Sequence, residues 1–441
     1  MKNAPSVHED PLVSQTREEI LDLYQRDDRP WVIAFSGGKD SSALLQLVVE
    51  ALGEATFHSL KPVYVISSDT LVEAPNVATY ISETIERLKD FSRQTAFPLE
   101  VTLVRPPVEQ TFWSKLIGQG YPSPTRWFRW CTSNMKIKPS RVEIDKITRK
   151  HGSVILLLGT RSSESSARSS RIKSRNVNSR GLNPHHEIPN ALVATPIVEW
   201  TNDQVWGYLS VNDPPPWGGS NEFLTELYHQ AGAADCPPVL DISTPPCGKS
   251  RFGCWTCTVV REDRSMKGFI QNGEERFAPL NRFRDRLKEV RERADWRMDR
   301  RKNGEPGPGP FRPQRRLQLL DELLSLEKEG GQQLISDEEI NFIQRQWEQE
   351  FDLKESALLI AAKHGRLVGK METDTLPPME QNVLEELVAE HGISPDLVDK
   401  LLRLVLIEYP DLRVYGTKTA LEKDLKEVII SYVNSVYAEE A

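Results

Sequence analysis

Apolar runs that end abruptly in polar residues recur through the first half of the chain. The runs WVIAF, KPVYVISS, LEVTLV and SVILLLG each predict a buried strand, and stretches with helical spacing lie between them. Strands that alternate with helices indicate an α/β fold with a parallel sheet. Ligands of such sheets bind beyond the carboxyl ends of the strands. Polar clusters follow three of the four runs at that point, namely SGGKDS, SSDT and GTRSSES.

The same patterns divide the chain into segments. Residues 1–29 hold one short amphipathic helix, and Ser14 is its expected N-cap. The α/β domain is expected over residues 30–270. Residues 271–316 predict a basic helix and a linker rich in Pro and Gly, and the apolar spacing of residues 317–441 predicts a helical C-terminal domain.

Two local signals lie inside the predicted α/β domain. Residues 162–185 are rich in Ser, Arg and Asn and have little apolar content, which predicts a mobile loop. The strand-like run ALVATPIVEW follows, and after it TNDQVW matches a capping box, with Thr201 as the N-cap and Gln204 three residues later. We therefore expect a helix to begin after Thr201.

Composition excludes several classes of protein. No run approaches 18 apolar residues, as a membrane span would, and the N-terminal residues lack the basic and apolar regions of a secretory signal. The five cysteines, three of them within eleven residues, fit metal-binding thiols in a reducing cytoplasm better than a secreted disulfide framework. With a net charge of −8, any polyanion site must come from a local basic patch. We expect a cytoplasmic protein with no membrane partner.

The cluster SGGKDSS, residues 36–42, lies between a predicted strand and a predicted helix. Two glycines allow a sharp turn and a close approach of the backbone to a ligand. Unpaired amides at the start of the helix, the serine hydroxyls and the helix dipole favour an anion such as phosphate. The spacing matches neither a Walker motif nor a dinucleotide-binding GxGxxG. A tight strand-to-helix turn with good capping residues is the alternative.

This stretch resembles the SGGxDS motif, or PP-loop, of the ATP pyrophosphatase superfamily, and so implies the adenine-nucleotide α-hydrolase-like fold of that superfamily. Its enzymes cleave ATP between the α and β phosphates, adenylate a substrate oxygen and release pyrophosphate. The resemblance implies that ATP and Mg²⁺ bind here, with Ser36, Lys39 and Asp40 taking part in catalysis. The nucleotide-binding residues that it implies are Ser36, Gly37, Gly38, Lys39, Asp40, Ser41 and Ser42.

Three further segments resemble the branch of this superfamily that includes phosphoadenosine phosphosulfate (PAPS) reductase. SSDTLVEAP resembles a segment after the second strand and implies Asp69 as a nucleotide-binding and catalytic residue. RWCTSNMKIKP resembles a cysteine–lysine segment, with Cys131 and Lys136. GTRSSESSAR resembles a GxRxxES element and implies Gly159 and Arg161 at the nucleotide. Alternatively, Asp69 is a helix N-cap and Arg161 a solvated loop charge.

The cysteines follow the pattern C-x10-C-x6-C-x2-C from Cys236 onward, with Cys131 far upstream. A zinc ribbon offers two CxxC halves, whereas this chain has one, and iron–sulfur clusters accept irregular spacing with single ligands from distant segments. The resemblance to the PAPS reductase branch implies a [4Fe–4S] cluster held by Cys131, Cys247, Cys254 and Cys257. Cys236 is the alternative ligand to Cys131. A cysteine left free could carry sulfur as a persulfide.

The segments CGKSRFGCWTCTVV and RWCT, together with the PP-loop strand, resemble the DndC family of bacterial DNA phosphorothioation proteins and its relative SspD. The resemblance implies a sulfurtransferase component that adenylates a DNA backbone oxygen, which sulfur then replaces. It implies DNA, a cysteine desulfurase as the sulfur donor and other phosphorothioation proteins as partners. A PAPS or APS reductase and a tRNA-thiolating enzyme are the alternatives. Sulfonucleotide reductases use a nucleophilic cysteine in a C-terminal tail, and this sequence has no cysteine after Cys257.

Three segments are candidates for contact with DNA. Residues 282–316 carry 13 Lys or Arg against 6 Asp or Glu, and phosphate contacts of this kind give affinity without reading sequence. A solvated helix with i,i+4 ion pairs is the alternative. Residues 168–180 carry five more basic side chains. In RWFRW, residues 126–130, arginines interleave with aromatic rings, which fits either a stacking surface or packed aromatics beside surface arginines.

Overall fold

The structure is a computed structural model that describes residues 10–54, 61–164, 182–185, 187–231, 253–352 and 354–369, together with short pieces between 394 and 430. The chain divides into two compact units. The first consists of Met1–Pro107 and Pro124–Lys288, and the second of Val108–Ser123 and Glu289–Ala441. The second unit thus includes a short segment from the middle of the sequence. The domain boundaries at 29, 270 and 316 stay a prediction.

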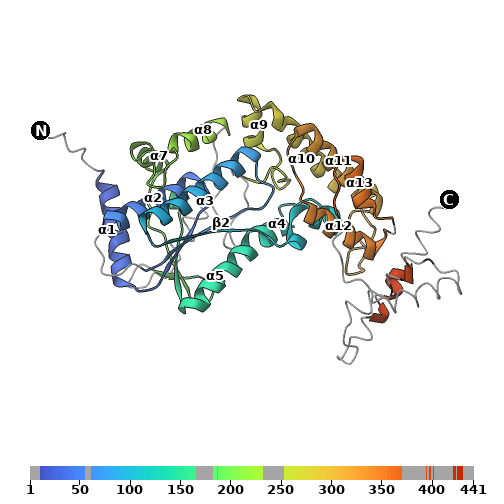
Figure 1. Cartoon of the computed structure of the whole chain (residues 1–441), viewed down its shortest axis with the longest axis horizontal. Coiled ribbons are helices and arrows are strands. Elements are labelled where there is room, and N and C mark those ends of the chain that lie inside the picture. The colour runs from blue at the N-terminus through green and yellow to red at the C-terminus, as the bar shows by residue number, and fades with distance from the viewer. Residues whose placement is uncertain are drawn as a thin grey trace, which may run out of the picture. The chain divides into compact units, whose positions relative to one another are not determined.

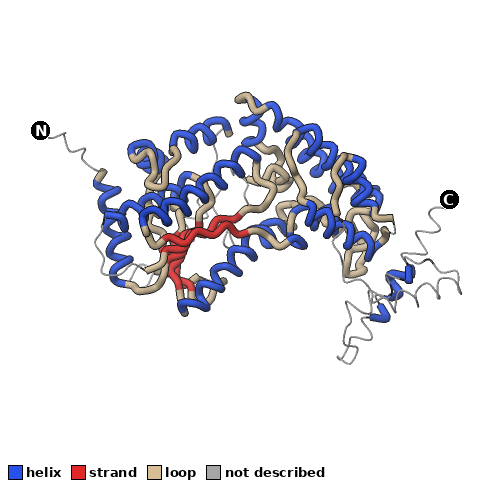
Figure 2. Tube along the Cα trace, viewed as in Figure 1, coloured by secondary structure: helices blue, strands red, loops and turns tan. Residues whose placement is uncertain are grey.

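A six-stranded sheet runs through the first unit (Figure 1, Figure 2). Its strands follow the order β3-β2-β1-β4-β6-β5, and every pairing is parallel except that of β5 with β6. The strands are β1 Trp31–Ala34, β2 Val63–Ser68, β3 Leu99–Val104, β4 Val154–Leu157, β5 Asn183–Pro184 and β6 Ala191–Ala194. The predicted α/β fold with a parallel sheet is confirmed.

Strands β1, β2 and β4 are buried on both faces, which is why each reads as a continuous apolar run and not as an alternation. In β1, Trp31 and Ile33 are fully enclosed. One face of the sheet packs on helix α5, Lys138–His151, through Ile144 and Ile147. Figure 1 shows this helix beside the strands.

Helices connect the strands of the first unit and extend beyond them. They are α1 Pro11–Arg26, α2 Lys39–Glu54, α3 Pro75–Thr95, α4 Trp130–Thr132, η3 Ser133–Ile137, α5, η4 Ser162–Glu164, α7 Asn202–Val211, α8 Asn221–Gln230, α9 Arg264–Gln271, η5 Glu275–Phe277 and α10 Ala278–Arg291. The capping box predicted at Thr201 and Gln204 is confirmed at the start of α7. The N-cap predicted for the first helix is wrong. Asp10 is the cap in place of Ser14, because Asp10 accepts the amide of Leu12 and the helix begins at Pro11.

The described part of the second unit is mostly helical. It contains η1 Val108–Gln110, η2 Ser114–Gly118, η6 Ala294–Trp296, α11 Pro313–Gly330, α12 Asp337–Glu350 and α13 Ser356–Lys363. Two buried indoles fasten the mid-sequence segment to these helices. Trp113 Nε1 donates to Leu334 O at 2.7 Å, and Trp347 Nε1 donates to Ile117 O at 3.1 Å. The predicted helical character of the C-terminal part is confirmed for the residues that are described.

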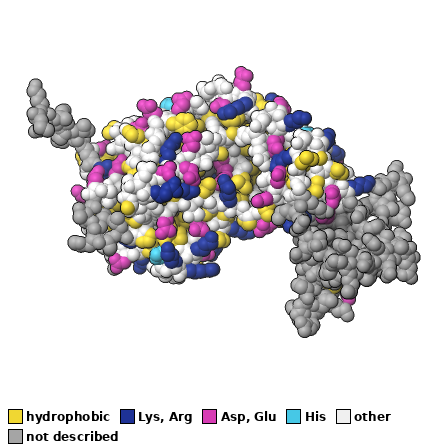
Figure 3. Space-filling view, viewed as in Figure 1, with side chains coloured by type: hydrophobic (Ala, Val, Ile, Leu, Met, Phe, Trp, Pro, Cys, Tyr) yellow, Lys and Arg dark blue, Asp and Glu magenta, His cyan; other side chains and the backbone are white. Residues whose placement is uncertain are grey.

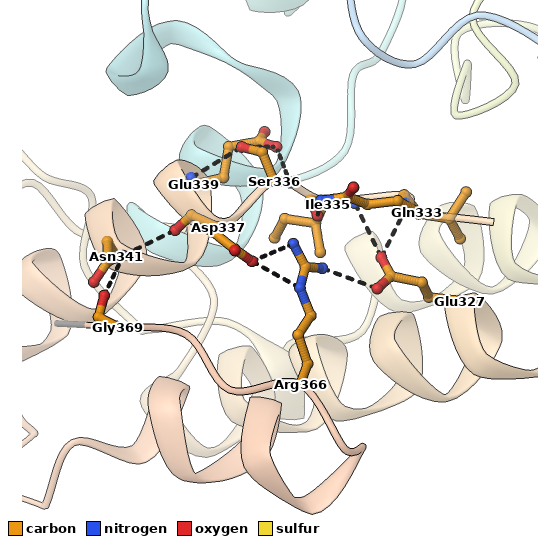
Figure 4. Close-up of polar contacts among 10 residues, drawn as sticks. Glu327, Gln333, Ile335, Ser336, Asp337, Glu339, Asn341, Arg366 and Gly369 are labelled. Carbon is orange, nitrogen blue, oxygen red and sulfur yellow. Dashed lines mark hydrogen bonds and ion pairs between the residues drawn. The ribbon is translucent and has the colours of Figure 1, made fainter. Parts of the chain in front are cut away.

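A guanidinium fastens the chain after α13 to two other helices, as Figure 4 shows. Arg366 Nε donates to Asp337 Oδ1 at 2.8 Å, and its Nη1 donates to Glu327 Oε1 at 2.9 Å. The second oxygen of Glu327 accepts the amide of Leu334 at 2.8 Å, just before the N-terminus of α12. Among the described residues, no helix is both long and apolar enough to cross a membrane.

Candidate nucleotide and cysteine site

The cluster SGGKDSS forms a tight turn between β1 and α2. Gly37 has a φ of +72°, and a Cβ there would lie 2.9 Å from Ile81 Cγ1, so both backbone angle and space require glycine. The Ser41 hydroxyl donates to Gly38 O at 2.9 Å and lies 3.1 Å from the Ser36 hydroxyl. The two serines therefore hold the turn from within.

The start of α2 offers hydrogen-bond donors to a ligand. The amides of Asp40 and Ser41 donate no hydrogen bond within the described part of the chain. The Ser42 amide closes the first turn on Gly38 O at 2.9 Å, and the Lys39 amide donates to the Tyr228 hydroxyl at 3.1 Å. Open amides at the positive end of a helix attract an anion. The turn is suited to a phosphate group.

Asp40 lies between two buried cations. Lys39 Nζ is 3.0 Å from its Oδ2, and Arg161 Nε is 2.6 Å from its Oδ1. Lys39 is fully buried and Arg161 is 2% exposed, so Arg161 is an internal ion-pair partner and not a solvated loop charge. Gly159 approaches the same point, because a Cβ there would lie 2.7 Å from Asp40 O. The structure therefore brings the residues predicted after β1 and β4 together.

These two loops flank the switch point of the sheet. Strands β2 and β3 lie on one side of β1, whereas β4 and β6 lie on the other. Connections that leave in opposite directions open a crevice at the carboxyl ends of β1 and β4, where ligands of open α/β sheets bind. Residues 36–42 and 159–161 line this position.

Asp69 follows β2 and is held in a turn. Its Oδ2 pairs with Arg105 Nε at 2.9 Å, and its Oδ1 accepts the amide of Leu71 at 2.8 Å. The N-cap of α3 is Ala74, so Asp69 does not cap that helix. Its side chain remains 21% exposed and can reach a ligand at this edge of the sheet.

The CxxC turn packs against the same strand end. Cys254 forms an antiparallel bridge with Glu73, and the Trp255 amide donates to Val72 O at 2.9 Å. Cys254 Sγ lies 3.3 Å from Thr70 Oγ1, which donates to Glu73 Oε1 at 2.6 Å. The turn is therefore joined to the segment after β2 by backbone and side-chain contacts.

Electrostatic effects show that Cys131 lies close to this turn. Burial raises the pKa of the Cys254 thiol well above its ordinary value; the Lys136 ammonium opposes the rise, while Glu73 and Cys131 add to it. Burial likewise raises the pKa of Glu73, again opposed by Lys136. Lys136 and Cys131 of the predicted cysteine–lysine segment therefore lie close enough to the CxxC turn to affect its thiol.

The complete ligand set stays a prediction. Cys131, Cys254 and Cys257 are in the thiol form, and the Cys257 amide donates to Cys254 O at 3.0 Å. Cys247 and Cys236 lie outside the described residues. Within the described ranges, no three His, Cys, Asp or Glu side chains are arranged to hold a metal ion.

Sequence reasoning missed a buried arginine that holds the backbone after the CxxC turn. Arg284 of α10 is fully buried, and it donates to the carbonyl oxygens of Cys257 at 2.8 Å, Arg261 at 3.3 Å and Val260. The sequence did contain a signal for the burial of this arginine. The buried neighbours on α10 fall at helical spacing and put position 284 on the apolar face; they are Leu280, Phe283, Leu287 and Val290.

Other arginines of the basic stretch 282–316 also bind the protein itself. Arg316 donates to Phe311 O at 2.9 Å and to Gly118 O at 3.0 Å, and Arg297 donates to Gly309 O at 2.5 Å. Figure 3 shows basic and acidic side chains interspersed over the face in view. DNA contact by this stretch stays a prediction, and residues 168–180 lie outside the described part of the chain.

The aromatic residues of RWFRW divide between core and surface. Trp130 is 6% exposed and packs inside, whereas Phe128 is 44% exposed and Trp127 is 96% exposed. The alternative of packed aromatics therefore holds for Trp130, and a stacking surface at the exposed rings stays a prediction.

Residues 30–260, more than half of the chain, match the family model of the phosphoadenosine phosphosulfate reductase domain. The chain belongs to this family. The matched residues include β1 to β6, the cluster SGGKDSS and the CxxC turn.

Two relatives from Methanocaldococcus jannaschii are uncharacterized proteins. One is 27% identical over 218 residues, which are 49% of this chain and 38% of the relative. The other is 26% identical over 243 residues, 54% of this chain and 50% of the relative. The chain thus spans half or less of the length of these curated relatives.

Two solved structures share low similarity with the chain. A tRNA thiolase from Methanococcus maripaludis with its [4Fe–4S] cluster gives a TM-score of 0.28 at 13% identity, covering 63% of this chain and 80% of that one. An FMN adenylyltransferase from Candida glabrata with FAD and pyrophosphate gives a TM-score of 0.28 at 14% identity, and the match covers 47% of this chain and 60% of the adenylyltransferase. The fold class rests on the sheet itself and not on these scores.

Proposed function

We propose that the chain is an ATP pyrophosphatase and sulfurtransferase that activates a DNA backbone phosphate for the replacement of one oxygen by sulfur. The observation that carries the proposal is the neighbourhood of two sites on one sheet edge. A turn with open backbone amides follows β1, and the Cys254 thiol packs beside the end of β2, the strand next to β1. Nucleotide activation and sulfur chemistry can therefore act on one substrate.

ATP would bind by its phosphates at residues 36–42. The open amides of Asp40 and Ser41 are donors for phosphate oxygens, and Lys39 and Arg161 are the nearest buried cations. Mg²⁺ bound with the nucleotide would neutralise part of the charge on the phosphates. Asp69, at the neighbouring strand end, is the carboxylate in position to orient the substrate or the metal.

Two displacements complete the reaction. First, a non-bridging oxygen of a DNA phosphodiester bonds to the α-phosphorus of ATP, and the bond from that phosphorus to the pyrophosphate oxygen breaks. The DNA phosphate is then joined to AMP. Second, sulfur at the oxidation level of hydrosulfide bonds to the DNA phosphorus, and AMP leaves with the activated oxygen. Charge grows on phosphate oxygens in both steps, and fixed amides and cations stabilise it.

The donor chemistry of these cysteines suits an iron–sulfur cluster, because their thiols are partly shielded from solvent and come from two distant segments. Cys131, Cys254 and Cys257, with Cys247, would hold a [4Fe–4S] cluster, which when bound would offer a site for incoming sulfur. Without a bound metal, the burial that raises the pKa of Cys254 keeps its sulfur protonated and unreactive.

A PAPS or APS reductase is a second candidate, favoured by the matching family model itself. A PP-loop enzyme that thiolates tRNA is a further candidate. Partners distinguish them, because the proposed reaction needs DNA, a cysteine desulfurase and the other proteins of a phosphorothioation system.

Iodine cleavage of cellular DNA tests the proposal, since iodine cuts a phosphorothioate backbone. In cells that supply the remaining proteins of the system, the wild-type chain should yield DNA that iodine cleaves, whereas Ser36→Ala should abolish cleavage. Ser82→Ala, at an exposed position of α3, is the matched control and should behave as wild type. Unchanged cleavage with Ser36→Ala would reject the proposal.

Pyrophosphate release separates the candidates. The purified protein should release pyrophosphate from ATP in the presence of DNA and its protein partners, and not in response to tRNA. Reduction of PAPS to sulfite by the purified protein would instead establish the reductase.

Metal analysis tests the cluster. Anaerobically purified protein should contain iron and sulfide, and Cys254→Ser should lose both. Stoichiometric zinc without iron would contradict a cluster in this site.

A further inference from the structure

Trp127 is the most exposed large hydrophobic side chain among the described residues, at 96%. Both faces of its indole ring are therefore open to solvent. Burying an indole is worth several kcal/mol, so a ring left fully in water is a strong candidate for contact with a partner. Trp130, three residues later, is 6% exposed and shows that the same segment can bury a ring when packing requires it.

The loop that carries this indole has a defined conformation. The Thr125 amide donates to Phe128 O at 3.2 Å, and the Thr125 hydroxyl accepts the amides of Trp127 at 3.3 Å and Phe128 at 3.0 Å. The loop is also fastened to the cysteine segment, because the buried Thr258 hydroxyl donates to Pro124 O at 2.8 Å. Trp127 therefore lies on a turn of defined conformation, and the loop loses little conformational entropy on binding.

The indole lies near the cysteines. Trp127 and Cys131 are four positions apart in the sequence, so their Cα atoms are at most about 14 Å apart. Thr258, whose hydroxyl donates to Pro124 O at the start of the loop, directly follows Cys257 of the CxxC turn. The exposed ring and the thiols therefore belong to one local structure within the first unit.

The segment that carries the ring is positively charged. Residues 124–142 contain five basic side chains and no Asp or Glu, although the whole chain has a net charge of −8. Arg126, the residue before Trp127, is exposed. The five are Arg126, Arg129, Lys136, Lys138 and Arg141.

We propose that Trp127 is a base-stacking platform for single-stranded DNA and that Arg126 binds the adjoining phosphate. The inference deepens the proposed function and rests on it for the identity of the substrate. A base stacked on the indole would anchor the strand within a few nucleotides of the thiols, so that a backbone phosphate lies at the site of sulfur transfer.

A nucleic acid fits this surface better than a protein does. Stacking on an aromatic face combined with cations for the backbone is how proteins bind single strands without reading sequence. The core of a protein interface is depleted in charged residues, whereas here an exposed arginine directly precedes the tryptophan and acidic residues are absent from residues 124–142. A single-stranded or unpaired stretch is required because a base inside a duplex has both faces covered.

Fluorescence anisotropy with a labelled 12-nucleotide DNA strand of mixed sequence tests the proposal, with the full-length protein and no ATP. Trp127→Leu keeps an apolar side chain but removes the aromatic face, and we expect it to weaken binding about 5- to 150-fold. Trp127→Phe should retain most of the affinity. Val211→Ala, which trims another exposed apolar side chain, should leave binding unchanged. Arg126→Gln should reduce the salt dependence of log K by about 0.7, as expected for one lost phosphate contact.

Equal affinity of Trp127→Leu and wild type would overturn the platform. A loss confined to an RNA strand of the same sequence, with DNA binding intact, would overturn the assignment to DNA. Because binding is measured without ATP or sulfur, these outcomes are independent of the iodine assay. A failed iodine assay with Trp127-dependent DNA binding would reject the proposed chemistry and leave the platform standing.

Discussion

Replacing Arg284 by Met should open the CxxC turn although no cysteine is substituted. The guanidinium is fully buried and donates to three backbone carbonyls, those of Cys257, Val260 and Arg261. A hydrogen bond from a charged donor contributes about 1.5–3 kcal/mol, and each buried acceptor left unsatisfied costs about 1–3 kcal/mol. The contributions of one network do not add fully, so we expect local opening to become easier by about 3–5 kcal/mol.

Such a loss is a large part of the total stability of a typical domain, which is about 5–15 kcal/mol. Hydrogen–deuterium exchange of the reduced, metal-free protein measures local opening directly, in peptides that cover residues 254–262. Iodoacetamide labelling followed by mass spectrometry gives a second readout. The Cys254 thiol should react faster in Arg284→Met, because the burial that raises its pKa is lost.

Arg282→Met is the matched control, since Arg282 lies on the same helix and is exposed. It should change exchange and labelling by no more than a surface substitution does, which is about 0.5 kcal/mol. If Arg284→Met shows the exchange and thiol reactivity of the control, the arginine does not hold the turn and the reasoning is wrong.

Two further predictions concern buried charges. Arg161→Met removes a buried partner of Asp40, and we expect the free energy of unfolding to fall by about 3 kcal/mol and ATP binding to weaken. In thermal melts, the double variant Arg161→Met/Asp40→Asn should recover part of this stability. An Arg161→Met variant as stable as wild type would refute the prediction. Burial raises the pKa of Glu339, so its stabilising effect is complete below the ordinary value of 4.5 and is lost as pH rises through the folded value. Glu339→Gln keeps a capping-box residue at the third position of α12. The melting temperature of this variant should therefore rise relative to that of wild type as pH increases above 4.5. A difference in melting temperature that stays constant from pH 4 to pH 8 would count against this.

The sequence alone predicted the features that depend on neighbours along the chain. Runs such as WVIAF predicted buried strands because both faces of β1 are covered, and the paired residues Thr201 and Gln204 predicted a cap that closes within three residues. However, two nearby residues can each be a plausible N-cap for the same helix. Asp10 caps the first helix where Ser14 was expected, since the aspartate directly precedes Pro11, a residue favoured at the first helical position.

The tertiary structure alone decided which distant residues meet. Arg161 pairs with Asp40 because the sheet order sets β4 beside β1, and Cys254 meets Thr70 because its turn packs at the end of β2. It also separated residues that look alike in sequence, burying Trp130 and exposing Trp127. A local pattern reports backbone preference and hydrophobicity, whereas burial, partner and pKa depend on segments that packing brings together from far along the chain.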